Sequence, residues 1–247
     1  MSIEPHFIKP CWTLPPNIVA YTTTRLGGYS QAAYKGLNVG MHVGDNTESV
    51  NKNRALLPNS NKLLWLNQVH GSEIVQLDST LESHTPPDAD GAFSCSADYH
   101  CAVMTADCLP VLMCDKKGTQ VAAVHAGWKG LALRILENAV RHFSVPLHEI
   151  SVWIGPAICK TCYEVDEGLM SKFAHYPSAI APSRNVNKYL LDLPHIAKLQ
   201  LNEIGIDNVT LSHLCTYCDK DTFYSHRYAT HHGLSSTGRI VSVIGLR

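Results

Sequence analysis

A cysteine and a histidine within one apolar segment, Cys108 and His125, are the residues whose types and spacing most favour chemistry in this chain. Two apolar runs flank the short loop after Asp115, and a glycine in that loop allows positive φ, which is typical of a β-hairpin. If the loop has two or three residues, Cys108 lies opposite His125 or within one residue of it. Directly opposed side chains have Cβ atoms about 5 Å apart, near enough to share a proton or a metal ion.

The residues around this pair suit an active site. Asp107 places a carboxylate beside the thiol, where we expect it to orient a ligand, and Pro110 removes one hydrogen bond from the strand ladder. The strand that ends at His125 runs into a glycine-bounded turn and a helical pattern that starts near Lys129. Free N–H groups at a helix start, together with the charge of Lys129, favour an anion there. An inert thiol beside a structural histidine is the alternative interpretation.

A third metal ligand is needed for a catalytic zinc site, which uses three protein ligands and keeps a fourth position open. His70 is the best candidate, because it ends the strand-like run 64–70 and precedes Gly71. Zinc in such a site lowers the pKa of water towards about 7. Copper is expected only as an adventitious substitute, since Cu²⁺ has the higher intrinsic affinity for the same ligands.

Strands and helices must position these residues. Apolar and β-branched runs predict strands at 18–24, 63–66, 73–77, 101–105, 111–114, 119–125, 150–154, 209–212 and 240–244. An apolar stripe predicts an amphipathic helix over 131–143, and start and stop signals predict helices over 45–57, 166–175 and 194–205. This irregular mixture predicts an α+β fold with mixed sheets, without giving the strand order.

Length and composition limit the classes of protein that this chain can represent. Of its 247 residues 45% are hydrophobic and 17% are charged, which suits a single globular domain over 1–247. The net charge of −1 gives no field that attracts nucleic acid. Residues 1–6 lack an export signal, and no apolar run approaches the roughly 18 residues of a membrane span. We therefore expect a cytoplasmic protein with reduced thiols and with no nucleic-acid or membrane partner.

Several sequence blocks in a fixed order give the chain a family resemblance. NQVHG (67–71), MTADCLPVLMCD (104–115) and AAVHAGWKG (122–130) resemble the signature of the YfiH/YlmD "laccase domain" family, a group of purine nucleoside phosphorylases formerly described as multicopper polyphenol oxidoreductases. The family order continues through TTTRLGG (22–28), GLNVGMHVGD (36–45), IGPAI (154–158), YEV (163–165), CTY (215–217) and TGR (237–239). The resemblance therefore spans nearly the whole chain.

The resemblance carries expectations for fold, metal and activity. It implies a single-domain αββα sandwich that shares its architecture with some cysteine hydrolases. It implies that His70, Cys108 and His125 bind one catalytic zinc ion. It also implies phosphorolysis of adenosine, inosine, guanosine and methylthioadenosine, and hydrolytic deamination of adenosine. Purine nucleosides and phosphate would be the partners, and the sequence does not give the oligomeric state.

Phosphorolysis requires groups that bind phosphate. Arg25, beside paired glycines, and Arg227, in the segment FYSHRY, are candidates because a guanidinium can donate two parallel hydrogen bonds to a phosphate. Asn38 and His42 are candidates for lining the substrate pocket, and Lys129 is a further candidate for binding the anion. A structural or solvated role is the alternative for each of them.

Two CxxC pairs, Cys159/Cys162 and Cys215/Cys218, hint at a structural zinc. The 52 residues between the pairs exceed the roughly 15–20 residues of a zinc ribbon. For these cysteines we therefore favour buried or incidental thiols over a second zinc or a redox pair.

Histidine spacing argues against a multicopper oxidase. Such an enzyme needs about ten histidines, mostly in HxH pairs that project from one side of a strand. None of the 14 histidines of this chain lies two residues from another.

Two other functions compete with the zinc nucleoside enzyme. Cys108 activated by His125 would be the metal-free nucleophile of an amide hydrolase, and some bacterial relatives are linked to the editing of peptidoglycan precursors that carry a misplaced serine. A non-catalytic, zinc-binding regulatory module would instead close its metal site with a fourth protein ligand.

Overall fold

Two large mixed β-sheets and one small sheet form the framework of the computed structural model, which describes residues 3–13, 15–77 and 85–247. The strands are β1 (Phe7–Ile8), β2 (Ile18–Thr23), β3 (Leu63–Leu64), β4 (Ile74–Leu77), β5 (Gly91–Ser94), β6 (His100–Thr105), β7 (Leu109–Asp115), β8 (Val121–Ala126), β9 (Ile150–Ile154), β10 (Glu164–Asp166), β11 (Ile180–Pro182), β12 (Lys188–Leu191), β13 (Val209–Leu211) and β14 (Ile240–Leu246). The sheet orders are β1-β2-β14-β6-β3, β13-β9-β7-β8-β5-β4 and β10-β12-β11.

Alternation of side chains along the strands explains how the two large sheets stack. In β7, Leu112 and Cys114 pack into the layer between the sheets, whereas Val111 and Met113 pack into the layer that the helices cover. All of these residues are fully buried, which a strand buried on both faces requires. The prediction of an α+β fold with mixed sheets is confirmed, and all nine predicted strands form. The sequence analysis missed β1, β5 and the small sheet.

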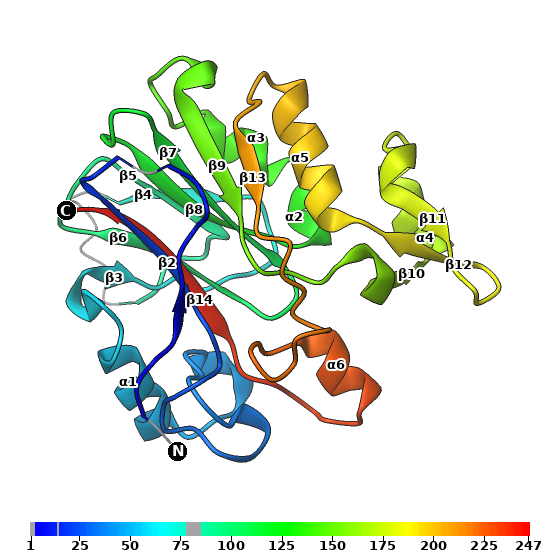
Figure 1. The fold of residues 1–247 in the computed structure, drawn as a ribbon, viewed down its shortest axis with the longest axis horizontal. Helices are drawn as coiled ribbons and strands as arrows, with labels where there is room; N and C mark the ends of the chain where they lie inside the picture. The colour runs from blue at the N-terminus through cyan, green and yellow to red at the C-terminus, as the bar shows by residue number, and fades with distance from the viewer. Residues whose placement is uncertain (1–2, 14, 78–84) are drawn as a thin grey trace.

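Helices cover the outer faces of the sheets, and α2, α3 and α5 lie beside the six-stranded sheet (Figure 1). The helices are α1 (Thr47–Ala55), α2 (Trp128–Ala132), α3 (Ile135–Val140), α4 (Glu167–Met170), α5 (Leu193–Glu203) and α6 (His226–His231). Among the described residues, no helix has the length and apolar character that crossing a membrane requires.

The single helix predicted over 131–143 is wrong, because the chain breaks between α2 and α3. Arg134 adopts φ of 58°, which an α-helix does not allow. Its guanidinium donates hydrogen bonds to the hydroxyl of Tyr176 at 2.9 Å and to the carboxylate of Glu203 at 2.8 Å. These distant contacts hold the break, while the predicted apolar stripe still packs on the sheet.

The other predicted helices form with shifted ends. The helix predicted over 45–57 is α1, and its capping residue is Asn46 rather than Asp45, because the Asn46 side chain accepts the N–H of Ser49 at 2.9 Å. The helix predicted over 166–175 is α4 followed by a short 3₁₀ turn over 171–173. The helix predicted over 194–205 is α5.

The β7–β8 hairpin has a wider loop than the sequence analysis assumed. Asp115 donates its N–H to the carbonyl of Gln120 at 3.1 Å, so four residues lie between them. The Asp115 carboxylate accepts the N–H groups of Thr119 and Gln120 at 2.6 and 2.7 Å, which stabilises this loop. His125 consequently pairs with Pro110. The prediction that Cys108 lies opposite His125 or within one residue is therefore wrong in register.

Candidate active site

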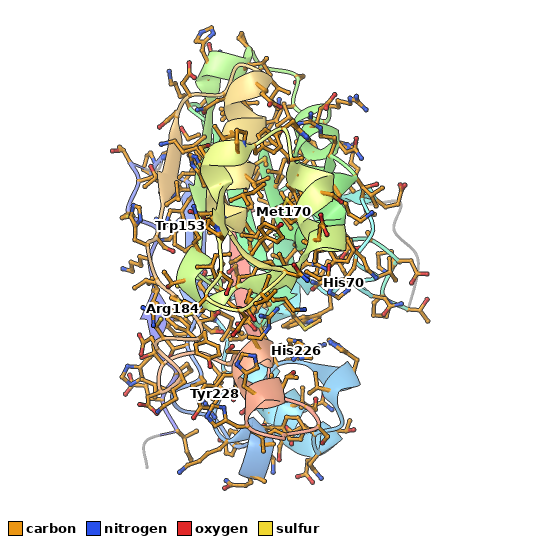
Figure 2. The ribbon with its side chains drawn as sticks, turned by 90° about the vertical axis from the view of Figure 1, so that its right-hand side faces the viewer. His70, Trp153, Met170, Arg184, His226 and Tyr228 are labelled. Atoms are coloured by element: carbon orange, nitrogen blue, oxygen red, sulfur yellow. The ribbon has the colours of Figure 1, made fainter. Side chains whose placement is uncertain are left out.

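A cleft of about 430 Å³ opens where β6 ends, β7 begins and β8 runs into α2. This volume suits a small-molecule ligand. Figure 2 faces this side of the molecule, with His70 and His226 near its middle. The lining residues are His42, Gln68, His70, Met104, Thr105, Ala106, Asp107, Cys108, His125, Trp128, Lys129, Tyr163, His226, Arg227 and Arg239.

The three predicted metal ligands converge in this cleft. His70, Cys108 and His125 each offer one ligand atom, and these atoms lie within 4.8 Å of one another. The rings of His70 and His125 stand edge to face, with centroids 4.8 Å apart. The spacing is of the size that a single metal ion needs, since the ligand atoms of a tetrahedral zinc ion lie roughly 3.5 Å apart. A Cβ at Gly127 would lie 2.9 Å from the Cys108 sulfur, which explains the glycine there.

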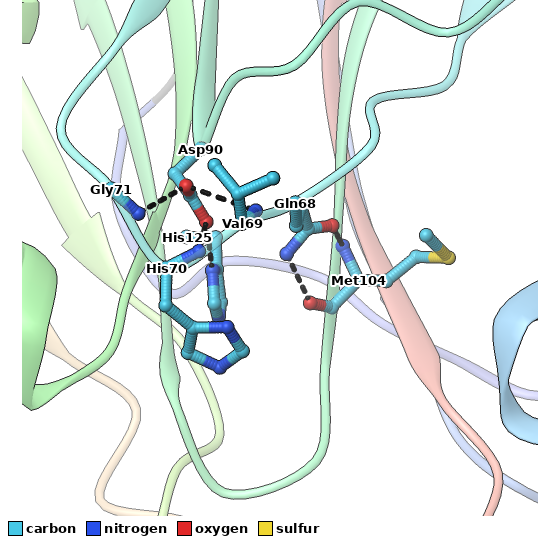
Figure 3. Close-up of polar contacts among 7 residues, drawn as sticks. All are labelled: Gln68, Val69, His70, Gly71, Asp90, Met104 and His125. Atoms are coloured by element: carbon cyan, nitrogen blue, oxygen red, sulfur yellow. Dashed lines mark hydrogen bonds and ion pairs between the residues drawn. The ribbon is translucent and has the colours of Figure 1, made fainter.

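A buried carboxylate fixes both histidines, and sequence reasoning missed it. Asp90 accepts a hydrogen bond from Nδ1 of His125 at 2.8 Å, which leaves Nε2 of that ring for a metal (Figure 3). The same carboxylate accepts the backbone N–H groups of Val69, His70 and Gly71 at 3.2, 3.0 and 2.6 Å. The Asp90 side chain therefore orients the His125 ring and also fixes the loop that carries the His70 ring.

Gln68 attaches the His70 loop to the five-stranded sheet. Its side-chain amide donates to the carbonyl of Met104 at 2.8 Å and accepts the N–H of Met104 at 2.7 Å (Figure 3). These two hydrogen bonds satisfy the N–H and the carbonyl of Met104 as a neighbouring β-strand would. His70 follows with φ of 59°, a left-handed conformation that turns its side chain into the cleft.

Electrostatics make Cys108, which directly precedes β7, unlike the cysteines buried within the strands. Burial alone raises the pKa of its thiol, but the imidazoles of His125 and His70 outweigh burial and lower that pKa to about 6. Burial alone lowers the pKa of His125, but the Cys108 thiolate and the Asp90 carboxylate outweigh it and raise that pKa to about 9. Before a metal binds, the thiolate and the imidazolium thus stabilise each other.

Cationic groups surround the remaining walls of the cleft. Arg227, Lys129 and His42 line it as predicted, together with Arg239, which the sequence analysis did not single out. Burial and the Arg239 guanidinium lower the pKa of His42. Arg239 is directed by hydrogen bonds to the carbonyls of Thr237 and Gly238 at 2.8 and 3.1 Å. Positive charge at this density favours an anionic ligand.

Two predicted substrate residues lie outside the cleft. Arg25 does not line the cleft; it donates to the carbonyls of Lys220 and Lys35 at 2.9 and 3.3 Å and stacks on the ring of Tyr224. Asn38 is fully buried and accepts the N–H of Arg239 at 2.9 Å. Asn38 therefore supports a cleft residue, and neither side chain is placed to contact a ligand in this cleft.

Asp107 orients the segment that carries Cys108, as a supporting carboxylate would. Its carboxylate accepts the hydroxyl of Thr216 at 2.7 Å and the N–H of Arg227 at 2.6 Å. Asp107 has φ of 91°, so the chain turns sharply just before the thiol. This turn brings Cys108 back towards His125 despite the shifted strand register.

The residues that sequence reasoning missed carry weak local signals. Asp90 stands in the polar stretch Asp88-Ala89-Asp90-Gly91 before a strand that was not predicted. Arg239 and Tyr163 belong to the TGR and YEV blocks, which marked the resemblance without indicating contacts. The spacing in sequence was also misleading for the two CxxC pairs, because their four side chains converge.

Comparisons with known proteins agree with this geometry. A purine nucleoside phosphorylase YfiH of Shigella flexneri is 38% identical over 97% of this chain and 98% of its own length. A purine nucleoside phosphorylase of Pseudomonas aeruginosa is also 38% identical, over 98% of each chain. The crystal structure of the Neisseria meningitidis protein NMB0706 superposes with a TM-score of 0.89 at 39% identity, covering 97% of this chain and 98% of that one.

Two further observations settle the family. The crystal structure of YlmD from Geobacillus stearothermophilus superposes with a TM-score of 0.84 at 29% identity, covering 94% of this chain and 93% of that one. The family model described as multi-copper polyphenol oxidoreductase laccase matches residues 19–247. The chain therefore belongs to that family, the YfiH/YlmD laccase-domain family.

Proposed function

We propose that the cleft binds one zinc ion through His70, Cys108 and His125 and catalyses phosphorolysis of purine nucleosides. Adenosine, inosine, guanosine and methylthioadenosine are the proposed substrates, and hydrolytic deamination of adenosine is a proposed second activity. The observation that carries the proposal is the presence of three potential metal ligands and three cationic side chains, Lys129, Arg227 and Arg239, in one cleft. The names of two relatives, each 38% identical to the chain, support the phosphorolysis of purine nucleosides.

The donor set fits zinc. Two imidazoles and a thiolate are ligands that zinc prefers, and Asp90 supplies the carboxylate that metal-bound histidines usually contact. Among the described residues, no fourth His, Cys or carboxylate joins the group, so the coordination sphere is open rather than closed as in a regulatory module. When bound, the ion supplies Lewis acidity to the substrate and lowers the pKa of water.

The cationic side chains bind and orient phosphate. In phosphorolysis a phosphate oxygen forms a bond to C1′ of the ribose, the bond from C1′ to the purine nitrogen breaks, and the purine leaves with a proton. Arg227, Arg239 and Lys129 reach the cleft from α6, from the residue before β14 and from α2. Holding the anion beside the ribose removes much of the entropic cost of its attack, and the fixed positive charges stabilise the transition state.

Deamination uses the same cleft without phosphate. Oxygen from water adds to C6 of adenosine and ammonia leaves, so this reaction requires no anion site. The two reactions therefore differ in their dependence on Arg239 and on added phosphate.

A multicopper oxidase reaction is not supported. The described residues hold two groups that are able to bind a metal, the cleft triad and the four cysteines. A multicopper oxidase requires several copper ions joined by many histidines. Copper remains an adventitious substitute in the cleft.

Nucleoside turnover by the zinc-loaded protein tests the proposal. We expect inosine to give hypoxanthine and ribose 1-phosphate only when phosphate is present, and adenosine to give inosine without phosphate. Chromatography of the bases and nucleosides measures both reactions. No turnover of any of the four nucleosides by protein with stoichiometric zinc would contradict the proposed function.

The Arg239→Gln variant separates the two activities. Loss of one charge-assisted contact to phosphate, on the order of 1.5–3 kcal/mol, should lower kcat/KM for phosphate about 10–100-fold. Deamination of adenosine should change less than about threefold. Arg25→Gln is the control, because Arg25 lies outside the cleft, and its KM for phosphate should match the wild type. Equal losses in both activities would contradict a phosphate-binding role for Arg239.

A second function is favoured by one observation. Cys108, His125 and Asp90 stand in the order nucleophile, base and orienting carboxylate that an amide hydrolase uses. In that reaction the Cys108 thiolate attacks the amide carbon, the amine leaves with the proton of His125, and water then hydrolyses the thioester to release the acid and restore the thiol. Rapid alkylation of Cys108 that stoichiometric zinc does not slow, together with no nucleoside turnover, would favour hydrolysis of amides such as peptidoglycan precursors.

A further inference from the structure

Four cysteine side chains converge on the side of the molecule that adjoins the cleft. The sulfur atoms of Cys159, Cys162, Cys215 and Cys218 all lie within 4.8 Å of one another, and those of Cys162 and Cys218 are 3.4 Å apart. A tetrahedral zinc ion with bonds of about 2.3 Å to sulfur has S–S edges of roughly 3.8 Å. Three of the residues are half-buried, and Cys218 is exposed. The cluster thus has the size of a four-thiolate zinc site.

Backbone N–H groups donate hydrogen bonds to a sulfur atom of the cluster, which favours the thiolate form. The N–H groups of Cys159 and Cys218 both donate to the Cys215 sulfur, at 3.3 and 3.4 Å. The first CxxC pair turns through a 3₁₀ helix (Lys160–Cys162), in which the N–H of Cys162 donates to the carbonyl of Cys159. Hydrogen bonds to sulfur stabilise negative charge on it. Two turns therefore present four sulfurs to one point.

Strand pairing brings the two CxxC pairs together despite their distance in sequence. β9 and β13 are parallel neighbours, and the chain beyond them continues the pairing in a bridge between Ala157 and Cys215. The N–H of Thr216 donates to the carbonyl of Ala157 at 3.1 Å. The intervening residues form the small sheet, α4, α5 and β13. The ribbon spacing of a compact zinc motif does not apply to this arrangement.

We propose that Cys159, Cys162, Cys215 and Cys218 bind one zinc ion as four thiolates in a structural site. Binding replaces four thiol protons with one Zn²⁺, so the protons are released and no oxidant is needed. Four protein ligands close the coordination sphere, which is the arrangement of structural zinc rather than of catalytic zinc. Two disulfides would join the sulfurs in pairs and would not require all four to meet at one point.

The proposed site supports the turn that carries Cys108. Ile158, the residue before Cys159, donates its N–H to the carbonyl of Asp107 at 3.0 Å. Thr216, the residue after Cys215, donates its hydroxyl to the Asp107 carboxylate at 2.7 Å. Both CxxC pairs thus contact the residue that precedes Cys108. A zinc ion that joins the pairs would fix this turn.

Metal counting on the full chain tests the proposal. The double variant Cys162→Ser/Cys218→Ser should contain one zinc equivalent fewer than the wild type when both are purified in reductant without chelator. Its melting temperature should fall on the order of 10 °C, because a structural zinc contributes to folding. The matched control is Cys11→Ser/Cys95→Ser, which changes two exposed cysteines elsewhere and should keep the wild-type zinc content. Mass spectrometry and thermal melting provide the readouts.

A second measurement applies if the double variant does not fold. Cys108→Ala leaves the four cysteines in place, and cobalt added to its apoprotein should give the charge-transfer and ligand-field bands of a tetrahedral four-thiolate site. Equal zinc content in the double variant and the wild type would overturn the proposal. Absence of the cobalt bands, iron in place of zinc, or disulfides among these cysteines after purification without reductant would also overturn it. The zinc difference does not depend on nucleoside turnover, since the cleft ligands are intact in both proteins compared.

Discussion

Replacing Cys108 with alanine is expected to remove one zinc equivalent per chain and to lower the rate of phosphorolysis at least about 1000-fold. Two imidazoles remain, but a site with two protein ligands binds zinc far more weakly than one with three. Loss of Lewis acidity worth several kcal/mol corresponds to a factor of this size. Metal analysis and inosine turnover with saturating phosphate measure the two effects on the same sample.

A cysteine in the strand that directly follows Cys108 supplies the control for this prediction. Cys114 of β7 is fully buried between the sheets, and burial, with a smaller contribution from the Asp115 carboxylate, raises the pKa of its thiol to about 12. It is an inert thiol, whereas Cys108 has a pKa lowered to about 6. Cys114→Ala should lower the free energy of unfolding by on the order of 1 kcal/mol and keep both zinc and turnover. Undiminished turnover in Cys108→Ala would show that the active site lies elsewhere.

The convergence of His70, Cys108 and His125 could be predicted in part, because His70 and His125 end strand-like runs that lead into a glycine and Cys108 follows an apolar run. Hairpin geometry indicated that Cys108 and His125 are close, although the predicted register was wrong. The error arose at Asp115, whose carboxylate stabilises a four-residue loop that apolar patterning does not reveal. The sharp turn at Asp107 then returned the thiol to the histidine. The sequence therefore predicted correctly that Cys108 and His125 lie close together, although the register was wrong and the turn at Asp107 was not foreseen.

Contacts between distant segments account for what the sequence could not show. Asp90 lies 35 residues from His125 and directly precedes β5, a strand whose small residues gave no strong pattern. The two CxxC pairs were judged by the spacing of a compact zinc motif, whereas parallel pairing of β9 and β13 brings them together. Arg25 had the local pattern of an anion site, but backbone carbonyls take its hydrogen bonds. Each outcome depends on strand order, which periodicity does not determine.

Asp90→Asn is expected to weaken zinc binding by about 10–100-fold, although Asp90 is not a ligand. One oxygen of the carboxylate accepts from the His125 ring and the His70 backbone, and the other accepts from Val69 and Gly71. Asparagine keeps a single acceptor oxygen, so its amide nitrogen would face two donors in a site with no exposed surface. The His125 ring and the His70 loop would both lose their fixed positions.

The same substitution should lower the free energy of unfolding by about 1–3 kcal/mol, because two buried N–H groups lose their acceptor. Burial raises the pKa of Asp90, but the hydrogen bonds from His125 and from the N–H of Gly71 outweigh it and lower that pKa, so the native contacts use the ionised carboxylate. Asp88→Asn makes the same chemical change two residues earlier at an exposed site and should alter neither quantity. Competition with a chelator measures zinc affinity, and urea unfolding measures stability. Wild-type zinc affinity in Asp90→Asn would mean that packing alone positions the histidines. A loss of zinc affinity without a loss of stability would mean that Asp90 orients the histidines but does not stabilise the His70 loop.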